Sequence, residues 1–574
     1  MVSSAVRIND LPAEVLEHIL LISDPFDVAR ASQVCRLFRG LVYADDEHFW
    51  RALYLAQPFD DPREAVTYLG NHRTGIKWRE ELQRIIRART VVHNVTVCRP
   101  EERCQVLRTL LDMVTNIPPL PFPESEPTSH NVLWMQTLLQ DGAFLDLESQ
   151  SHEERQLRAR LHTWFGLTDR DGLAAKRIDS RAYVYSQRNY RSLNSFGPYA
   201  LDGSGLVNWE HMQKLAHVFA RNLVEREEEE EEEGEEEVAF EVCSLSLAFC
   251  QAVIPPGLDL DRESDWAGVE GLWRISYCFM DHRELLIYND LNSPEDVPLD
   301  HAIFEDAKET FSSINLFIRV INVEQDPDHP TRPKINYVGE MDGNFSIVGY
   351  VKLTPDNQIR WHFVAGNGDQ GRAVWCGEAI SMGNVRSRYG VLGAWSTTLH
   401  DPQDPIGAHD CGERLLQRLI YDLLIVCLGN ICRSPMGEAV LRNEALKRGI
   451  TDIHVDSAGT ASAHVGDDPD ERTITVCSTN DVPISHSARQ VRARDFSSFD
   501  YILAADASNL RSLERHPGRS EESKAAVKLW GSYLPDNKPI QDPYYGGLGG
   551  FTKCYEQCVK LSNAFLDEVV GKKD

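Results

Sequence analysis

Basic side chains are scarce in this sequence: 59 Lys and Arg stand against 88 Asp and Glu, for a formal net charge of -29 at pH 7. Binding to nucleic acid or to an anionic membrane surface needs clustered Lys and Arg, so we expect neither partner. We also expect no signal peptide and no membrane-spanning helix, because no apolar run of suitable length is present. The 13 cysteines include no Cys-x-x-Cys pair, which is typical of reduced thiols in a cytoplasmic or nuclear protein.

One stretch consists almost entirely of acidic residues. Residues 225–237 hold eleven Glu and one Arg, which predicts a solvated, disordered linker. A chain of 574 residues is also too long for one hydrophobic core. We therefore predict several domains, with boundaries at 5–55, 56–224, 225–237, 238–400, 401–421 and 422–572.

The stretch richest in chemistry begins at Leu423. Leu423 to Val426 form a continuous apolar run that is typical of a buried strand. Ser434-Pro435 is typical of a helix N-cap followed by proline at the first helical position. Between them lies a loop with Cys427 at its head and Arg433 at its tail. Backbone N–H groups and a helix N-terminus favour an anion there, and a guanidinium matches two phosphate oxygens. The alternative is an ordinary buried cysteine, but the pattern favours phosphoryl transfer through a phosphocysteine.

The run Cys427-Leu-Gly-Asn-Ile-Cys-Arg-Ser434 resembles the signature of the low-molecular-weight protein tyrosine phosphatases, and the resemblance extends from about Asp422 to Val570. It implies an α/β domain with a parallel sheet, and a phosphotyrosine protein or aryl phosphate as substrate. It also implies that Cys427 is the nucleophile and that Arg433 binds phosphate and the transition state, with no metal and no cofactor. The intervening loop residues would be Leu428, Gly429, Asn430, Ile431 and Cys432.

The same resemblance extends to a later loop, Gln541-Asp542-Pro-Tyr544-Tyr545. Asp542 would be the general acid and base, and the two tyrosines would line the substrate cleft. The resemblance further implies that Asn430, Ser434, Ser457 and His486 form a supporting network, and that Asp506 orients Arg433. The chain departs from the family near Ala463, where the usual aromatic residue beside the cleft is missing.

Three alternatives remain open at this stage. An arsenate reductase of this fold would use further redox cysteines, for which Cys477, Cys554 and Cys558 are the candidates. An arginine phosphatase is disfavoured by Ile431, where those enzymes tend to carry threonine. The domain could instead bind phosphorylated proteins without catalysis, although such a module has no need of Asp542. Cys432 could form a reversible disulfide with Cys427.

The N-terminal residues 8–55 have the apolar spacing of short helices. The order Leu-Pro-x-Glu-Val-Leu, then Val-Cys-Arg-x-Phe-Arg, then a late Trp resembles the F-box. The resemblance implies docking onto the Skp-type adaptor of a cullin–RING ubiquitin ligase. The contacting residues would be Leu11, Pro12, Val15, Leu16 and Ile19.

The middle of the chain changes its period. Residues 60–224 have helical apolar spacing, whereas alternating segments from Trp273 onward predict an antiparallel sandwich or barrel. One of the predicted strands is Leu285–Tyr288. Gly366 to Gly371 has the letters of a dinucleotide motif, but no helix pattern follows it, so we predict a hairpin loop. The arrangement is similar to fungal F-box proteins and implies a module that captures proteins. The predicted fold class is therefore multidomain: a helical F-box and helical region, an antiparallel β-rich domain, and an α/β domain with a phosphate-binding loop.

Overall fold

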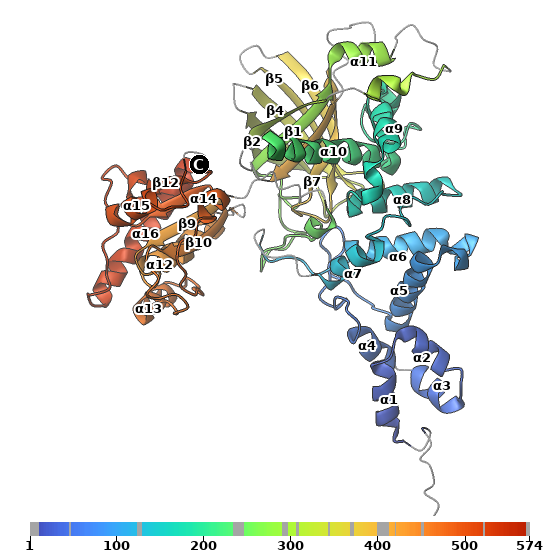
Figure 1. Cartoon of the computed structure of the whole chain (residues 1–574), viewed down its shortest axis with the longest axis horizontal. Coiled ribbons are helices and arrows are strands. Elements are labelled where there is room, and N and C mark those ends of the chain that lie inside the picture. Colours follow the sequence, from blue (N-terminus) through green and yellow to red (C-terminus); the bar gives the residue numbers. More distant parts are fainter. Residues whose placement is uncertain are drawn as a thin grey trace, which may run out of the picture. The chain divides into compact units, whose positions relative to one another are not determined.

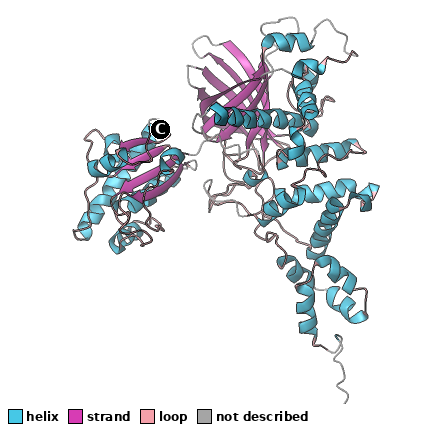
Figure 2. Cartoon of the chain, viewed as in Figure 1, coloured by secondary structure: helices cyan, strands magenta, loops and turns pink. Residues whose placement is uncertain are grey.

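A computed structural model describes residue 8 and residues 11–44, 47–122, 129–233, 246–289, 297–305, 309–341, 345–367, 372–398, 412–418, 421–448, 450, 453–520 and 523–569. The chain forms two compact units (Figures 1 and 2). The first comprises residues 1–121 and 125–417, and the second comprises 122–124 and 418–574. In the described part of the chain, no helix has the length and apolar character needed to cross a membrane.

The first unit begins with four short helices and continues with six longer ones. The short helices are α1 (Ala13–Leu21), α2 (Pro25–Ala31), α3 (Arg36–Val42) and α4 (His48–Leu55). The longer ones are α5 (Trp78–His93), α6 (Arg103–Thr115), α7 (His130–Leu139), α8 (His152–Phe165), α9 (Ala174–Val184) and α10 (Trp209–Glu233). One hydrophobic cluster runs from the short helices through α8 and α10 to the nearby strands.

An antiparallel barrel of eight strands completes the first unit, as the alternation predicts. The strands are β1 (Gly271–Met280), β2 (Glu309–Glu324), β3 (Lys334–Met341), β4 (Phe345–Leu353), β5 (Ile359–Asn367), β6 (Arg372–Met382), β7 (Gly390–Thr397) and β8 (Gly412–Arg418). Helix α10 packs against β1 and β7 (Figure 1). The predicted hairpin is confirmed by the pairing of Asn367 with Arg372, although residues 368–371 lie outside the described part.

Four expectations for the first unit need correction. Leu285–Tyr288 belongs to a helix, α11 (His282–Asn289), because the Asp281 side chain accepts the backbone N–H groups of Arg283 and Glu284 and so caps a helix start. The acidic run is helical as far as Glu233, since glutamate is a good helix former; residues 234–237 are not described. Residues 412–418 of the expected linker form β8, while 401–411 and 419–420 are not described.

The fourth correction concerns the F-box residues. Leu16 is 1% exposed and packs in the core, so it does not belong to an exposed docking surface. It is buried because Leu16 and Leu20 are four residues apart and lie on the inner face of α1. Val15 and Ile19 are 43% and 37% exposed, and Leu11 is half-buried beside the exposed Pro12.

The second unit is the predicted α/β domain. Its four strands pair in parallel in the order β10-β9-β11-β12, and they are β9 (Tyr421–Cys427), β10 (Ile453–Gly459), β11 (Tyr501–Ala504) and β12 (Ala526–Leu529). Leu423 to Val426 are fully buried because β9 lies between two other strands. The helices are α12 (Arg433–Lys447), α13 (Glu471–Thr479), α14 (Asp495–Ser498), α15 (Ala507–Glu514) and α16 (Leu548–Val569).

Candidate active site

Cys427 is the last residue of β9, and the loop after it turns back around the cysteine sulfur. The backbone N–H of Asn430 donates to Sγ at 3.3 Å, and the Ser434 hydroxyl lies 3.0 Å from the same sulfur. Asn430 makes this turn with a φ of 57°, a left-handed conformation that asparagine tolerates better than most residues. An N–H donor, a hydroxyl and the N-terminus of α12 therefore surround the sulfur, and this environment stabilises negative charge beside it.

The start of α12 differs from the prediction. The helix begins at Arg433, and its N-cap is Cys432 rather than Ser434. The Ser434 hydroxyl is instead engaged by Cys427 and by the Asn430 amide, so a serine that has the sequence signature of a cap serves the loop. A site contact has overridden the local capping pattern.

The side chain of Asn430 ties this loop to the rest of the unit. Its Nδ2 donates to the hydroxyls of Ser434 and Ser457, both at 2.9 Å. Its Oδ1 accepts the backbone N–H of Arg489 at 2.8 Å and lies 2.9 Å from Nε2 of His486. Both donors and both acceptor positions of the amide are used, so the loop is held in one conformation before any ligand arrives. The sequence-predicted network is thus brought together in space.

Glu438 completes this network and was missed by the sequence reasoning. Its Oε2 accepts the Ser457 hydroxyl at 2.8 Å and lies 3.0 Å from Nδ1 of His486. Burial alone would raise the pKa of Glu438, but the hydrogen bond from His486 and the charge of Arg442 outweigh it and hold that pKa below its usual value. The only sequence signal was an acid on a helix whose neighbours, Met436, Ala439 and Val440, have core spacing.

Arg433 is 3% exposed and bonds two carboxylates. Its Nη1 donates to Asp506 at 2.5 Å and to the carbonyl of Ile540 at 3.2 Å, and its Nη2 donates to Asp542 at 2.8 Å. Burial works to lower the pKa of Arg433, but neighbouring Cys427, Asp506 and Asp542 raise it overall. The structure therefore joins the two ends of the predicted site, which lie 109 residues apart, through one guanidinium.

The loop that carries Asp542 is anchored to α13 by a residue that the sequence did not single out. Arg472 donates to the backbone carbonyls of Tyr544 at 3.1 Å and Gly546 at 2.8 Å, and its guanidinium lies 4.4 Å from the ring of Phe551. The Asp542 side chain is 40% exposed. Tyr544 is 39% exposed, which leaves its ring available to a ligand beside the acid.

Tyr544 and Tyr545 form an edge-to-face pair with ring centroids 5.0 Å apart, and Tyr545 is 95% exposed. His464 lies nearby, with its ring centroid 6.5 Å from that of Tyr544. A Cβ added to Gly429 would lie 3.0 Å from Cδ2 of His464, so this imidazole rests on the loop after Cys427. Asp467 holds it through a 3.0 Å contact with Nδ1. His464, one residue after the missing aromatic, therefore lines the same region.

The remaining loop residues have distinct environments. Leu428 is 55% exposed at the mouth, whereas Ile431 is 9% and Cys432 5% exposed. Burial raises the pKa of Cys432 to about 12, with a further contribution from Asp470, so this residue stays a neutral thiol at ordinary pH.

The described residues of this network form no evident binding site for a metal ion. Glu438, Asp456 and His486 offer ligand atoms within 4.8 Å of one another. However, Asp456 is bonded by Arg489 at 2.7 Å, and the other two are engaged with Ser457 and Asn430. The expectation of a metal-free reaction stays a prediction.

Comparisons with known proteins assign two parts of the chain to known families. A family model described as low molecular weight phosphotyrosine protein phosphatase matches residues 422–574, and one described as F-box-like matches residues 8–56. A low molecular weight phosphotyrosine protein phosphatase of Schizosaccharomyces pombe is 47% identical over 151 residues, 26% of this chain and 96% of that protein. A Homo sapiens protein of the same description is 45% identical over 156 residues, 27% of this chain and 99% of that protein. The crystal structure of Primo-1 is 38% identical, with a TM-score of 0.25, and the match covers 26% of this chain and 99% of that one.

Proposed function

The chain belongs to the low-molecular-weight phosphotyrosine protein phosphatase family through residues 422–574 and carries an F-box-like domain at residues 8–56, and from this premise we propose that it hydrolyses phosphotyrosine or aryl phosphate monoesters through a phosphocysteine. The observation that carries the proposal is the guanidinium of Arg433, which reaches Asp542 and lies beside Cys427 in a loop fixed by Asn430.

In the first step the thiolate of Cys427 attacks phosphorus, and the bond from phosphorus to the aryl oxygen breaks. Arg433 and the N-terminus of α12 neutralise the equatorial phosphate oxygens. Asp542, protonated, gives its proton to the leaving oxygen, so that a phenol departs and phosphocysteine remains. Arrival of the phosphate would displace Asp542 from Nη2 of Arg433 and free this acid for the transfer.

In the second step Asp542, now a carboxylate, takes a proton from water, and the resulting hydroxide attacks phosphorus. The bond from phosphorus to sulfur breaks, inorganic phosphate leaves and the thiolate of Cys427 returns. Ser434, whose hydroxyl lies 3.0 Å from the sulfur, would stabilise that leaving thiolate by donating to it.

Two alternatives have less support. A redox relay of the arsenate reductase kind needs accessible thiols, but Cys477, Cys554 and Cys558 are at most 3% exposed. Burial raises the pKa of Cys477 to about 12, which makes it unreactive. A module that only binds phosphorylated proteins would not need Asp542 ion-paired to Arg433 at 2.8 Å.

For the first unit we propose an F-box role: docking onto a Skp-type adaptor of a cullin–RING ubiquitin ligase. Support comes from large apolar side chains that are exposed on α1 and α2 or directly after them: Val15 (43%), Ile19 (37%), Ile22 (75%), Phe26 (43%) and Val34 (76%). Exposed apolar groups on neighbouring helices are typical of a protein interface. Both the free thiol of Cys427 and this partner fit the reducing cytoplasm.

Hydrolysis of p-nitrophenyl phosphate by the full chain tests the phosphatase proposal. Cys427→Ser should abolish turnover, and Asp542→Ala should reduce kcat by about 10²–10⁴, the usual contribution of a general acid. Asp536→Ala is the control, because this exposed acid of the same unit pairs with neighbouring Lys538. If the unsubstituted protein is as inactive as Cys427→Ser, both as the full chain and as residues 418–574, the result would favour a module that binds phosphorylated proteins without catalysis.

Copurification with a Skp-type adaptor tests the F-box proposal. Ile19→Asp should abolish the complex, since a charge on an apolar interface is left unpaired. Leu173→Asp is a matched control, because Leu173 is 58% exposed on the same unit but outside the F-box helices. Equal adaptor binding by parent and Ile19→Asp would contradict the assigned surface.

A further inference from the structure

The first unit contains a cavity of about 590 Å³. Helices α8, α9 and α10 and the loop before α8 surround it, and Met382, Tyr389 and Leu392 of the barrel close one side. Pockets that hold ligands span about 300–1,000 Å³. None of the chemistry proposed above uses this cavity.

Charged side chains on its wall are paired with one another. The pairs are Lys176 with Asp146 (2.6 Å) and Asp171 (3.1 Å), Lys214 with Asp179, Arg155 with Glu210 (3.4 Å), and Arg158 with Glu154 behind the wall (2.8 Å). Among the described lining residues, Glu148 adds one acidic charge that is not in an ion pair. A wall of paired charges has little net attraction for a charged ligand, because binding such a ligand would require breaking a pair.

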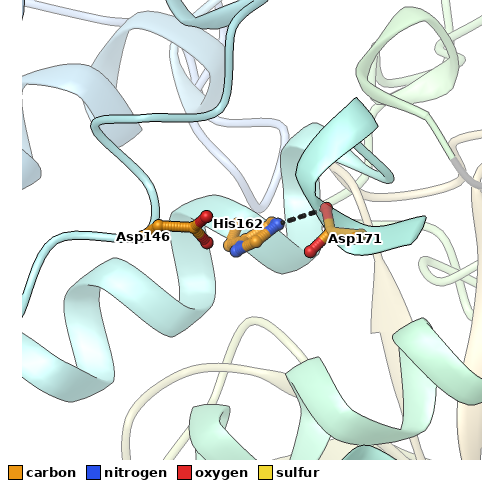
Figure 3. Close-up of side chains that lie close together, drawn as sticks. All are labelled: Asp146, His162 and Asp171. Carbon is orange, nitrogen blue, oxygen red and sulfur yellow. Dashed lines mark hydrogen bonds and ion pairs between the residues drawn. The ribbon is translucent and has the colours of Figure 1, made fainter. Parts of the chain in front are cut away.

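Both ring nitrogens of His162, on this wall, have polar partners (Figure 3). Its Nε2 lies 3.0 Å from Asp171, and its Nδ1 lies 2.8 Å from the Gln213 amide. Asp146, His162 and Asp171 could in principle hold a metal, since their ligand atoms lie within 4.8 Å of one another. The ammonium of Lys176 already bonds both carboxylates, so the position of a cation is filled by the chain itself.

Most of the remaining lining residues are apolar, beside the uncharged Ser149, Thr163, Ser180 and Gln213 and the ring of His217. Leu145, Met382 and Leu392 are buried around the cavity, and alanines at 159, 216 and 220 leave the space open where longer side chains would fill it. Empty apolar volume and buried charges both cost stability, and a fold that keeps them together usually uses them.

We propose that this cavity receives a large uncharged apolar side chain of a peptide segment, and that this segment belongs to the protein that the F-box unit presents for ubiquitination. The inference rests on the F-box part of the proposed function. One hydrophobic cluster joins Leu20 and Leu53 of the F-box helices to Leu145, Met382 and Leu392, which line the cavity. A captured peptide would therefore be held on the same packed body as the adaptor-binding surface, as presentation to a ligase requires.

A library of immobilised nonapeptides tests this with the full chain. The central residue is fixed as Leu, Phe, Trp, Asp or Lys, and the flanks are mixtures of uncharged residues. We expect at least tenfold enrichment of Leu, Phe or Trp over Asp and Lys. Ala216→Phe, which fills the cavity, should abolish the enrichment, whereas Ala175→Phe, on the exposed side of α9, should preserve it.

A variant at the rim of the cavity distinguishes a change in peptide binding from a loss of folding. Lys214→Ala leaves exposed Asp179 without its cation, so peptides with a Lys flank should gain severalfold over those with an Asp flank. No apolar enrichment by the parent, enrichment of Asp or Lys, or retention by Ala216→Phe would each overturn the inference. Ile19→Asp should keep the peptide selectivity while losing the adaptor, so that failure of the F-box proposal is seen separately.

Discussion

Arg433 meets a carboxylate with each of its terminal nitrogens, and a bound phosphate needs two parallel donors. Lysine keeps the charge but offers a single point donor. Arg433→Lys should therefore reduce kcat/KM by about 10²–10³, the loss expected for one transition-state donor. Steady-state kinetics with an aryl phosphate measure this effect. Arg448→Lys, at an ion pair with Asp567 in the same unit, should change kcat/KM by less than about twofold. An equal loss of kcat/KM in the two variants would contradict the role of the two parallel donors of Arg433.

His464 directly follows Ala463, near which the family resemblance leads us to expect an aromatic residue. Its close approach to Gly429 and its place near Tyr544 predict that it packs on the aryl ring of a substrate. His464→Ala should raise KM for an aryl phosphate by about three- to tenfold with little change in kcat, which corresponds to about 1 kcal/mol. His464→Phe should restore KM. An equal effect of His464→Ala on a small alkyl phosphate would show that ring packing is not the cause.

Glu438 gives a prediction in pH. Its pKa is held below the ordinary value in the fold, so its carboxylate stabilises the native state at neutral pH, and this contribution disappears as pH falls through the folded pKa. Glu438→Gln should lower the Tm of the second unit at pH 7, and the difference from the parent should shrink below about pH 4. Thermal unfolding from pH 7 to pH 3 measures both. A difference that persists unchanged at pH 3 would assign the effect to shape rather than charge.

At the scale of elements, α12 approaches the buried ring of Trp530 through a glycine. A Cβ added to Gly437 would lie 2.6 Å from Cζ3 of that ring, whereas a Cβ on Gly549 of α16 meets nothing within 4 Å. Gly437→Ala should therefore cost about 1–3 kcal/mol through overpacking, despite the better helix propensity of alanine. Gly549→Ala should be neutral or slightly stabilising. Chemical denaturation of both variants measures the difference, and equal stabilities would mean that Trp530 moves freely.

The elements also show how far the sequence determines this structure. Alternation of apolar and polar residues predicted the barrel strands because each strand has one face toward the core. It failed at Leu285–Tyr288 because a four-residue apolar run has no clear period, and the Asp281 cap favours a helix there. The loop of Cys427 and the distant Asp542 were predictable through their motif. Glu438, Arg472 and His464 were not, because their roles come from contacts between elements that no spacing in the sequence encodes.

For the whole molecule, the hydrophobic clusters predict two independent folding units. Two clusters contain only residues from 421 onward, and the other two contain only residues before 398. Because no described cluster crosses this boundary, heating should give two transitions. Saturation with orthovanadate at 100 times its Kd should stabilise only the second unit, by about 2.7 kcal/mol. Calorimetry of the full chain with and without vanadate measures this. Cys427→Ser should lose most of the shift, and a single transition that moves as a whole would show that the two units are coupled.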